Sequence, residues 1–363
     1  MIIKVLKLHN KIDKRILKEQ LEQEAQKRIT LSFYQYANIG NTSVFRDHIY
    51  TRWAEVGVYG RIYVAHEGVN AQISVPKTQW TAFEKEVNDI VFLRNIRLNI
   101  AIEDDGKSFY KLKIKIRNKI VADGLNDETF DVTNRGVHLD AQRFNQLTED
   151  KNTIIVDMRN HYESEVGHFD GAICPDVDTF REALPLMEEQ LSENKDKNIV
   201  MYCTGGIRCE KASAYYKHKG FKNVFQLEGG IIEYARQVEK QGLENKFKGK
   251  NFVFDDRLGE RISTEIISQC HQCGNPCDTH VNCANEACHH LFIQCQACAT
   301  KYAQCCTEAC QAYNSLPEET RKELRKGIVT HKKQYVKART SPFLENKEIQ
   351  EKVWELVGGN KDI

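Results

Sequence analysis

The six residues Cys203-Thr204-Gly205-Gly206-Ile207-Arg208 lie between an apolar run at 198–202 and a helix-compatible segment that begins at Cys209. The apolar run predicts a buried strand, and the two glycines allow the backbone to curl so that successive N–H groups point inward. The N-terminus of the following helix adds partial positive charge at the same place. The sequence therefore predicts a strand–loop–helix unit of an α/β domain, with a loop that favours an anion at Cys203.

This loop also predicts a reactive cysteine, because the thiolate is the nucleophilic form of cysteine. We expect Gly205 and Gly206 to shape the amide cradle and Arg208 to supply positive charge, so that the pKa of the Cys203 thiol falls. The alternative is a buried cysteine before an ordinary glycine turn. Protein tyrosine phosphatases enclose phosphate in a longer Cys-x5-Arg loop. The four residues between Cys203 and Arg208 make a tighter ring, which favours sulfur chemistry over phosphate chemistry.

Further motifs stand before and after the loop. A predicted buried strand at 152–158 precedes Gly167-His168-Phe169-Asp170-Gly171-Ala172, and Glu228-Gly229-Gly230 follows the last predicted strand. From about residue 138 to residue 241 the chain resembles a rhodanese domain. This resemblance implies a parallel α/β fold and a persulfide carried on Cys203.

Two charged residues at the end of the strand at 152–158 are candidates for a supporting role. Asp157 and Arg159 either form an internal ion pair that holds two loops together or take a direct part in the chemistry. His168 is expected to be structural, as the cap of a turn.

Composition limits the class of protein. The chain has 363 residues, enough for two or three domains with separate cores, and carries a formal net charge of +1 with 28% charged residues. Contact with nucleic acid therefore has to come from local basic patches. No apolar run approaches the roughly 20 residues that span a membrane, and the N-terminus lacks a signal-peptide core. We expect a soluble cytoplasmic protein without a membrane partner.

The cysteines are concentrated near the C-terminus. Ten of the thirteen fall between Cys270 and Cys310, and such local Cys-x2-Cys pairs in a cytosolic chain favour zinc over disulfides. One predicted tetrahedral set is Cys270, Cys273, Cys295 and Cys298, and the second is Cys283, Cys288 and Cys310 with Cys305 or Cys306. Substitute ligands are His271, Cys277, His280, His289 and His290. The alternative is a group of reduced cysteines or adventitious disulfides, whereas a cross-braced pair of structural zinc ions would stabilise a segment with few large apolar residues.

The first hundred residues show a different pattern. Hydrophobic periodicity predicts strands at 31–37, 61–65, 69–75 and 97–102 and helices at 42–56 and 78–91. The resulting order β-α-β-β-α-β predicts a ferredoxin-like or acylphosphatase-like sandwich, with an added strand and charged helix within residues 1–28. The turn at 66–70 is expected to be structural, with Gly68 in an unusual backbone conformation.

A basic stretch follows this region. Lys111, Lys113, Lys115, Arg117 and Lys119 alternate with residues that are mostly apolar, which predicts a strand over 111–120 with one cationic face. Charges about 7 Å apart along such a strand match an RNA backbone. The alternative is a solvated face or a sheet edge protected by lysines. A second basic segment, 321–326 and 331–339, predicts a helix near the C-terminus that either holds RNA or solvates a tail.

Together these segments narrow the resemblance. The N-terminal run Gly60-Arg61-Ile62-Tyr63-Val64-Ala65-His66-Glu67-Gly68-Val69-Asn70, the Cys203 loop, the run Asn251-Phe252-Val253-Phe254-Asp255-Asp256-Arg257 and the cysteine-rich tail resemble the oxygen-dependent tRNA uridine hydroxylase family over nearly the whole chain. The resemblance implies hydroxylation of the wobble uridine of certain tRNAs to 5-hydroxyuridine, with tRNA and molecular oxygen as substrates and Cys203 required. No nucleotide cofactor is expected. The alternatives are a persulfide sulfurtransferase acting on a thiol or RNA acceptor and a non-catalytic RNA-binding protein.

Three domains are expected from these patterns. They are a ferredoxin-like (acylphosphatase-like) domain at 1–125, a rhodanese-like domain at 126–250, and a cysteine-rich, zinc-stabilised region with a charged helical tail at 251–363.

Overall fold

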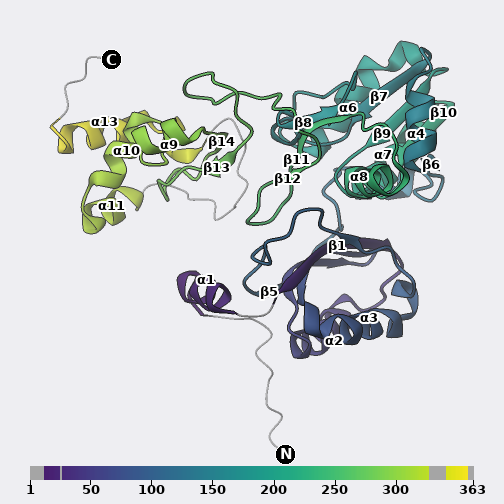
Figure 1. Ribbon diagram of the computed structural model, residues 1–363, viewed down its shortest axis with the longest axis horizontal. Helices are drawn as coiled ribbons and strands as arrows, with labels where there is room; N and C mark the ends of the chain where they lie inside the picture. The colour runs from purple at the N-terminus through teal and green to yellow at the C-terminus, as the bar shows by residue number, and fades with distance from the viewer. Residues whose placement is uncertain (1–11, 25–26, 327–340, 359–363) are drawn as a thin grey trace, which may run out of the picture.

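The computed structural model describes residues 12–24, 27–326 and 341–358, and it confirms the predicted mixed α/β fold class (Figure 1). An N-terminal sandwich, a central parallel α/β domain and a cysteine-rich C-terminal region follow one another along the chain. Within the described part of the chain, no helix is long and apolar enough to cross a membrane.

The N-terminal region has the predicted order of strands and helices. Its sheet has the order β4-β1-β3-β2-β5, in which the first four strands form the ferredoxin-like arrangement and β5 adds to the edge, parallel to β2. The elements are α1 (Lys14–Gln23), β1 (Arg28–Tyr36), α2 (Thr42–Glu55), β2 (Tyr59–Ala65), β3 (Gly68–Pro76), η1 (Lys77–Gln79), α3 (Trp80–Asp89), η2 (Val91–Leu93), β4 (Asn99–Ile100) and β5 (Leu112–Ile116).

The two faces of this sheet differ because side chains alternate along each strand. One face carries apolar residues such as Leu31, Phe33 and Ile73, which pack with Trp53 of α2 and Phe83 of α3 in a closed core. The other face carries polar residues and is turned toward the central domain. This polar face matters for function, because part of it lines a pocket that the Cys203 loop also lines.

The central domain is built on a parallel sheet of order β6-β10-β9-β7. Separate apolar clusters pack on its two faces, as expected for a parallel sheet covered by helices on both sides. The elements are η3 (Asp127–Thr129), β6 (Val137–Leu139), α4 (Ala141–Thr148), β7 (Thr153–Asp157), α5 (His161–Ser164), β8 (Gly167–Phe169), α6 (Phe180–Gln190), η4 (Ser192–Asn194), β9 (Asn198–Tyr202), α7 (Ile207–His218), β10 (Asn223–Leu227) and α8 (Gly230–Gln241).

The C-terminal region joins the central domain through the short sheet β12-β11-β8. An apolar cluster across this junction unites Tyr162 and Val166 of the central domain with Phe252, Leu291 and Ile293. The elements are β11 (Phe247–Asn251), β12 (Glu260–Arg261), β13 (His280–Asn282), β14 (Leu291–Ile293), α9 (Gln296–Lys301), α10 (Glu308–Ser315), α11 (Glu318–Arg325), α12 (Pro342–Glu345) and α13 (Lys347–Leu356).

Two predictions about basic segments need correction or restriction. The strand predicted over 111–120 is wrong in length, because β5 ends at Ile116, which is 38% exposed. The segment 321–326 lies mainly on α11, whereas 331–339 falls outside the described residues. Most of the strand expected within 1–28 also falls outside them.

Candidate active site and metal centres

Cys203 follows the last residue of β9, and the loop after it leads directly into α7. Gly206 adopts a left-handed conformation, with φ of 97°, and its backbone N–H donates to Cys203 Sγ at 3.1 Å. An L-residue with a side chain rarely adopts this conformation, so a glycine is required here. The predicted loop is therefore present, and it places an amide donor on the sulfur.

The start of α8 packs against this loop and donates hydrogen bonds to its backbone. The backbone N–H groups of Ile231 and Ile232 donate to the carbonyl oxygens of Cys203 and Thr204 at 3.1 and 3.3 Å. A Cβ on Gly230 would lie 2.5 Å from the Cys203 carbonyl oxygen, so this close approach also requires a glycine. The Glu228-Gly229-Gly230 motif thus serves the Cys203 loop although it lies 25 residues later in the sequence.

The thiol of Cys203 is almost fully buried, yet its surroundings favour the thiolate. Burial raises the pKa of Cys203. The Cys209 thiol, the Arg208 guanidinium and the backbone N–H groups of both residues lower it by a larger amount, so the resulting pKa is about 6. Burial also raises the pKa of Cys209 well above its usual range, and the neighbouring Cys203 raises it more, so Cys209 stays a neutral donor. Cys203 is thus the ionised member of the pair at neutral pH.

Arg208 is fixed by a buried carboxylate. Its Nη2 lies 2.9 Å from Oε1 of Glu163, which is fully buried on α5, and its guanidinium packs 5.5 Å from the ring centre of Phe254. A capping box in which Asn160 and Glu163 bond each other's backbone holds α5 in place. Glu163 is a positioning residue whose role was not predicted from the sequence, because a single glutamate in a short helix carries no distinctive spacing.

Asp157 and Arg159 form the internal ion pair that was one of the two predictions for them. Both side chains are fully buried, and Arg159 Nη2 lies 2.6 Å from Asp157 Oδ2 and also donates to the Gly167 carbonyl at 2.6 Å. Neither residue lines the pocket at Cys203. His168 Nδ1 lies 2.9 Å from the Ser164 carbonyl oxygen, in keeping with a structural role.

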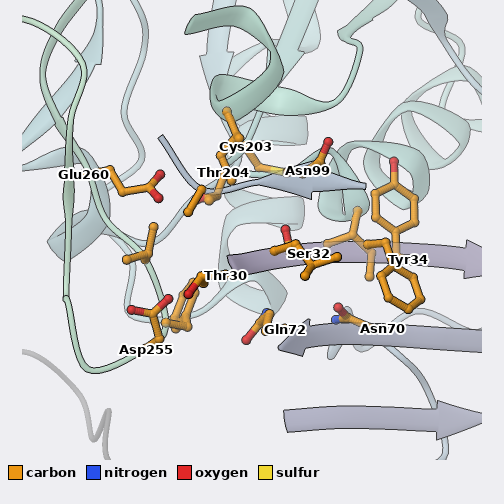
Figure 2. Close-up of a pocket in the computed structure, with 18 of the residues that line it drawn as sticks. Thr30, Ser32, Tyr34, Asn70, Gln72, Asn99, Cys203, Thr204, Asp255 and Glu260 are labelled. Carbon is orange, nitrogen blue, oxygen red and sulfur yellow. The ribbon is translucent and has the colours of Figure 1, made fainter. Parts of the chain in front are cut away.

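A pocket of about 730 Å³, partly open to solvent, lies between the Cys203 loop and the polar face of the N-terminal sheet. Figure 2 shows the polar side chains of β1 and β3 facing Cys203 and Thr204 across this space. The sheet residues that line it with polar side chains are Thr30, Ser32, Tyr34, Asn70, Gln72 and Asn99.

Two buried oxygen atoms at this pocket have no hydrogen-bond partner within the described residues: Asn99 Oδ1 and Glu260 Oε2. Asn99 is 4% exposed and Glu260 is fully buried. Since a buried polar atom without a partner is costly, these two atoms indicate that the pocket takes a polar ligand. Neither residue was predicted from the sequence as part of the site. For Asn99, the polar alternation along the strands was the available signal.

The five predicted RNA-binding residues are not equivalent. Lys113 and Lys115 project from β5, and the pKa of Lys115 falls because of burial and then because of the nearby charges of Lys113, Arg117 and Arg61. Lys119 lies beyond the strand and pairs with Asp123 at 2.7 Å and Asp127 at 2.8 Å. Lys111 and Arg117 lie over the rings of Tyr110 and Tyr63. The structure thus keeps a cationic group at the sheet edge but turns Lys119 toward carboxylates.

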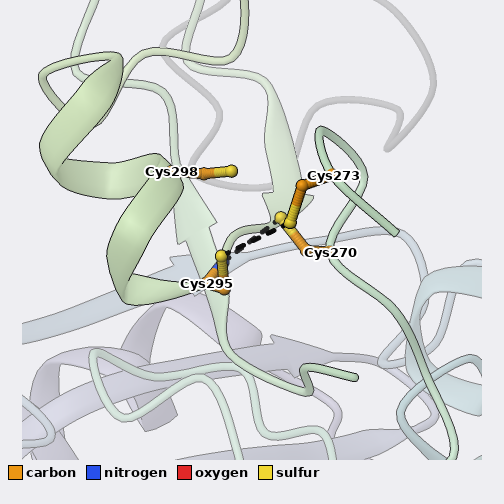
Figure 3. Close-up of side chains that lie close together, drawn as sticks. All are labelled: Cys270, Cys273, Cys295 and Cys298. Carbon is orange, nitrogen blue, oxygen red and sulfur yellow. Dashed lines mark hydrogen bonds between the residues drawn. The ribbon is translucent and has the colours of Figure 1, made fainter. Parts of the chain in front are cut away.

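The cysteines form two groups in which all four sulfur atoms lie within 4.8 Å of one another. Figure 3 shows the first, Cys270, Cys273, Cys295 and Cys298. The second contains Cys283, Cys288, Cys306 and Cys310, whereas Cys305 Sγ accepts a hydrogen bond from Asn314 instead. The pairs alternate along the chain between the two groups, as cross-bracing requires.

The geometry of both groups fits tetrahedral zinc. Zinc–sulfur bonds of about 2.3 Å place the sulfur atoms of a tetrahedral site about 3.8 Å apart. The Cys273–Cys295, Cys288–Cys306 and Cys306–Cys310 sulfur pairs lie 3.6, 3.7 and 3.7 Å apart. Backbone N–H groups of Cys295 and Cys306 also donate to Cys270 and Cys283, which stabilises thiolates. His271 pairs with Glu165 instead, and neither group includes His280, His289, His290 or Cys277.

Three protein-family models match separate parts of the chain. Residues 28–120 match the UPF0176 acylphosphatase like domain, residues 140–237 match the Rhodanese-like domain, and residues 248–311 match Rhodanase C-terminal.

Curated proteins similar to this chain share one name. The chain is 54% identical over 335 residues to the tRNA uridine(34) hydroxylase of Leptospira interrogans, which is 92% of this chain and 91% of that protein. It is also 54% identical over 333 residues to the tRNA uridine(34) hydroxylase of Photorhabdus laumondii, 92% of this chain and 95% of that protein.

Solved structures are similar to part of this chain. A single-domain sulfurtransferase from Saccharomyces cerevisiae is 20% identical, with a TM-score of 0.26, over 31% of this chain and 98% of that one. A rhodanese-like domain protein from Staphylococcus aureus is 24% identical, with a TM-score of 0.23, over 27% of this chain and 90% of that one.

Proposed function

The chain belongs to the tRNA uridine(34) hydroxylase family, and from this membership we propose that it hydroxylates the wobble uridine of tRNA to 5-hydroxyuridine. The observation that carries the proposal is the thiolate-favouring Cys203 at one wall of a pocket whose opposite wall is the polar face of a sheet of a second domain. In this proposal a flipped base enters the pocket, and the two unpartnered oxygen atoms in the pocket wall favour a polar ring. A cytoplasmic location, where tRNA is found, is part of the proposal.

The proposed chemistry begins with addition of the Cys203 thiolate to C6 of uracil. The Sγ–C6 bond forms with the sulfur electron pair, and the C5=C6 electron pair shifts toward C5 and O4. C5 thereby becomes nucleophilic and accepts one oxygen atom from molecular oxygen. The second oxygen atom leaves as water, so the balance requires two electrons and two protons from a donor such as a small-molecule thiol.

Each member of the loop has a defined part in this proposal. The Gly206 N–H and the Arg208 guanidinium keep Cys203 ionised before it attacks and stabilise it again when it leaves. Gly205 leaves space above the loop, since a Cβ there would lie 3.6 Å from Asn99 Nδ2 and 3.9 Å from Ser32 Oγ. Asp157 and Arg159 support the loop through the end of β7 without contact to substrate.

We propose that the RNA reaches this pocket over the polar face of the N-terminal sheet. Register places residues of neighbouring strands side by side on that face, in two rows that run from the pocket to β5. The first row is Asn99, Ser32, Gln72, Arg61 and Lys113, and the second is Tyr34, Asn70, Tyr63 and Lys115.

The rows set the distance between the pocket and the cations. Lys113 lies two strands beyond Gln72, which corresponds to about 10 Å at the usual strand spacing. Phosphates that flank a base bound at Cys203 would therefore meet Arg61, Lys113, Lys115 and Arg117. Lys111 and Lys119 are secondary members of the proposed surface, the latter because of its ion pairs.

We propose structural zinc in both cysteine groups. Bound zinc would fix the loops that carry the eight cysteines and would add folding free energy to a region with a small core. The first group belongs to the same apolar cluster as Tyr162, the neighbour of Glu163, so it also supports the wall that holds Arg208.

The decisive experiment compares tRNA nucleosides by mass spectrometry after incubation with the wild-type protein or Cys203→Ala. Each protein is assayed in air and without oxygen, with a thiol reductant present. We expect uridine 34 to gain one oxygen atom only with wild-type protein in air. No gain under any condition would reject the hydroxylase proposal, and thiocyanate formation from thiosulfate would then identify a sulfurtransferase.

A further inference from the structure

Glu260 lies in the wall of the Cys203 pocket with one oxygen atom unused. Its Oε1 accepts from Arg257 Nη1 at 2.5 Å and from the Ile102 backbone N–H at 3.2 Å. Its Oε2 has no partner within the described residues, although the side chain is fully buried. Figure 2 shows the carboxyl group projecting toward the space beneath Thr204 and Cys203.

Glu260 shares its guanidinium partner with a second carboxyl group. Arg257 is shared between two buried carboxyl groups, those of Asp255 and Glu260. Asp255 uses both of its oxygen atoms, because Oδ1 accepts from the backbone N–H and Nε of Arg257 and Oδ2 accepts from Nη2. One guanidinium cannot neutralise two carboxylates, so the group favours binding of a proton. Burial raises the pKa of Glu260, while Arg257 lowers it less.

At neutral pH, the other titratable groups of the pocket wall are unsuited to accept a proton from a bound nucleobase. Tyr34 is a neutral phenol because burial raises its pKa well above the usual range. Arg208 and Arg257 are permanent cations, and Cys203 is the nucleophile of the proposed reaction. Glu260 is the carboxylate of this wall with an oxygen atom available.

We propose that Glu260 is the general base that removes the hydrogen from C5 of the uracil ring after C5 has been hydroxylated. The inference rests on the proposed function, in which Cys203 is bonded to C6 at that stage. Oε2 takes the hydrogen as a proton, and the C5–H electron pair forms the C5=C6 double bond. The Sγ–C6 bond then breaks and leaves its electron pair on Cys203 as the thiolate. The proton passes from Glu260 to water when the product leaves, so the step needs no oxidant or reductant.

The environment of Glu260 suits a group that accepts a proton and later releases it. Arg257 and the Ile102 N–H fix Oε1, so the carboxyl group is held in place in the pocket wall while Oε2 keeps its bonding capacity. The raised pKa brings the carboxyl group nearer to neutral pH, where a general base is most effective. A carboxyl group with a purely structural role would be expected to have both oxygen atoms bonded.

The test uses the full-length protein, an anticodon stem-loop with uridine at position 34, air and a thiol reductant. Wild type, Glu260→Gln, Glu260→Asp and Glu103→Gln are compared. Glu103 is an exposed glutamate that accepts from the Arg261 N–H outside the pocket, so its variant is a matched control. The readouts are 5-hydroxyuridine by mass spectrometry, RNA linked to protein after acid quench, and the pH midpoint of Cys203 alkylation.

We expect Glu260→Gln to form product at least about 100-fold more slowly and to accumulate protein-linked RNA, because general base catalysis usually contributes about 10²–10⁴-fold. Its alkylation midpoint should equal that of wild type. Glu260→Asp should recover part of the rate, and Glu103→Gln should match wild type.

Three outcomes would overturn the inference. They are product formation by Glu260→Gln within about threefold of wild type, slow product formation without linked RNA, and a shifted Cys203 midpoint, which would indicate a structural role. A wild-type protein that adds no oxygen would instead reject the proposed function itself, so the two failures are distinguishable.

Discussion

The backbone N–H of Gly206 donates to the Sγ of Cys203 at 3.1 Å, so the left-handed glycine of the loop bears directly on the charge of the thiol. The same loop ends in Arg208, whose guanidinium is held by Glu163. Reactivity at Cys203 therefore depends on backbone geometry and on a buried ion pair together.

The pH dependence of Cys203 should report on Arg208. Alkylation requires the thiolate, so its rate in the wild-type protein should rise with pH through a midpoint at about 6. Arg208→Gln removes a positive charge and leaves Glu163 unpaired nearby, and both changes favour the neutral thiol. We expect the midpoint to move upward and alkylation at pH 7 to slow. Arg181→Gln, at an exposed position outside the pocket, is the control, and an equal midpoint in both variants would contradict the assigned role.

The two glycines of the loop should respond differently to a methyl group. Gly206→Ala forces an L-residue into a left-handed conformation, at a cost of about 1–2 kcal/mol. It also places Cβ 2.8 Å from the Tyr34 hydroxyl. Gly205→Ala meets nothing closer than 3.6 Å.

Urea unfolding and Cys203 alkylation would measure the outcome of these two substitutions. We expect Gly206→Ala to lower the free energy of unfolding and to raise the alkylation midpoint, while Gly205→Ala changes neither. Equal effects of the two substitutions would show that the left-handed conformation does not set the thiol charge.

Zinc content should show which of the neighbouring residues Cys305 and Cys306 binds a zinc ion. We expect two zinc ions per chain by elemental mass spectrometry, one for each group of four sulfur atoms. Cys306→Ser should leave one, because Cys306 belongs to the second group, whereas Cys305→Ser should keep two. Chelation should lower the melting temperature of the wild-type protein. Loss of one zinc ion from Cys305→Ser with both retained in Cys306→Ser would reverse the ligand assignment.

RNA affinity should depend on β5 more than on Lys119. Each lost phosphate contact reduces the slope of log affinity against log salt by about 0.7 for a single strand. We expect the double variant Lys113→Ala, Lys115→Ala to bind an anticodon stem-loop more weakly and to reduce the slope by about 1.4. Lys119→Ala should leave the slope unchanged because Lys119 pairs with Asp123 and Asp127.

Fluorescence anisotropy at several salt concentrations measures both RNA-binding quantities. A full change of slope in Lys119→Ala would mean that its ion pairs open when RNA binds.

Features set by local sequence were predictable. The loop from Cys203 to Arg208 depends on two glycines, a strand and a helix that are adjacent in the chain. The β-α-β-β-α-β order follows from hydrophobic periodicity, and the observed elements match it. The first cysteine group also follows from spacing, because each of its two Cys-x2-Cys pairs already places two sulfur atoms close together.

Predictions that needed the ends of elements were less accurate. Alternation of charge predicted one strand from 111 to 120, but β5 pairs with β2 only as far as Ile116. Beyond that point Arg117 and Lys119 find partners in Tyr63 and in two carboxylates, which periodicity does not encode. The choice between Cys305 and Cys306 likewise depended on which sulfur the fold brings next to the other three of the second group.

The sequence by itself determined that Cys203 lies in an amide-lined loop with an arginine after it, because backbone conformation and short spacing act within a few residues. Only the tertiary structure decided what faces that cysteine. Asn99 and Glu260 reach the pocket from two other parts of the chain, through the packing of the N-terminal sheet and of the segment around β12 against the central domain. Contacts between distant segments follow from burial of whole surfaces, and no local pattern in the chain records which surfaces meet.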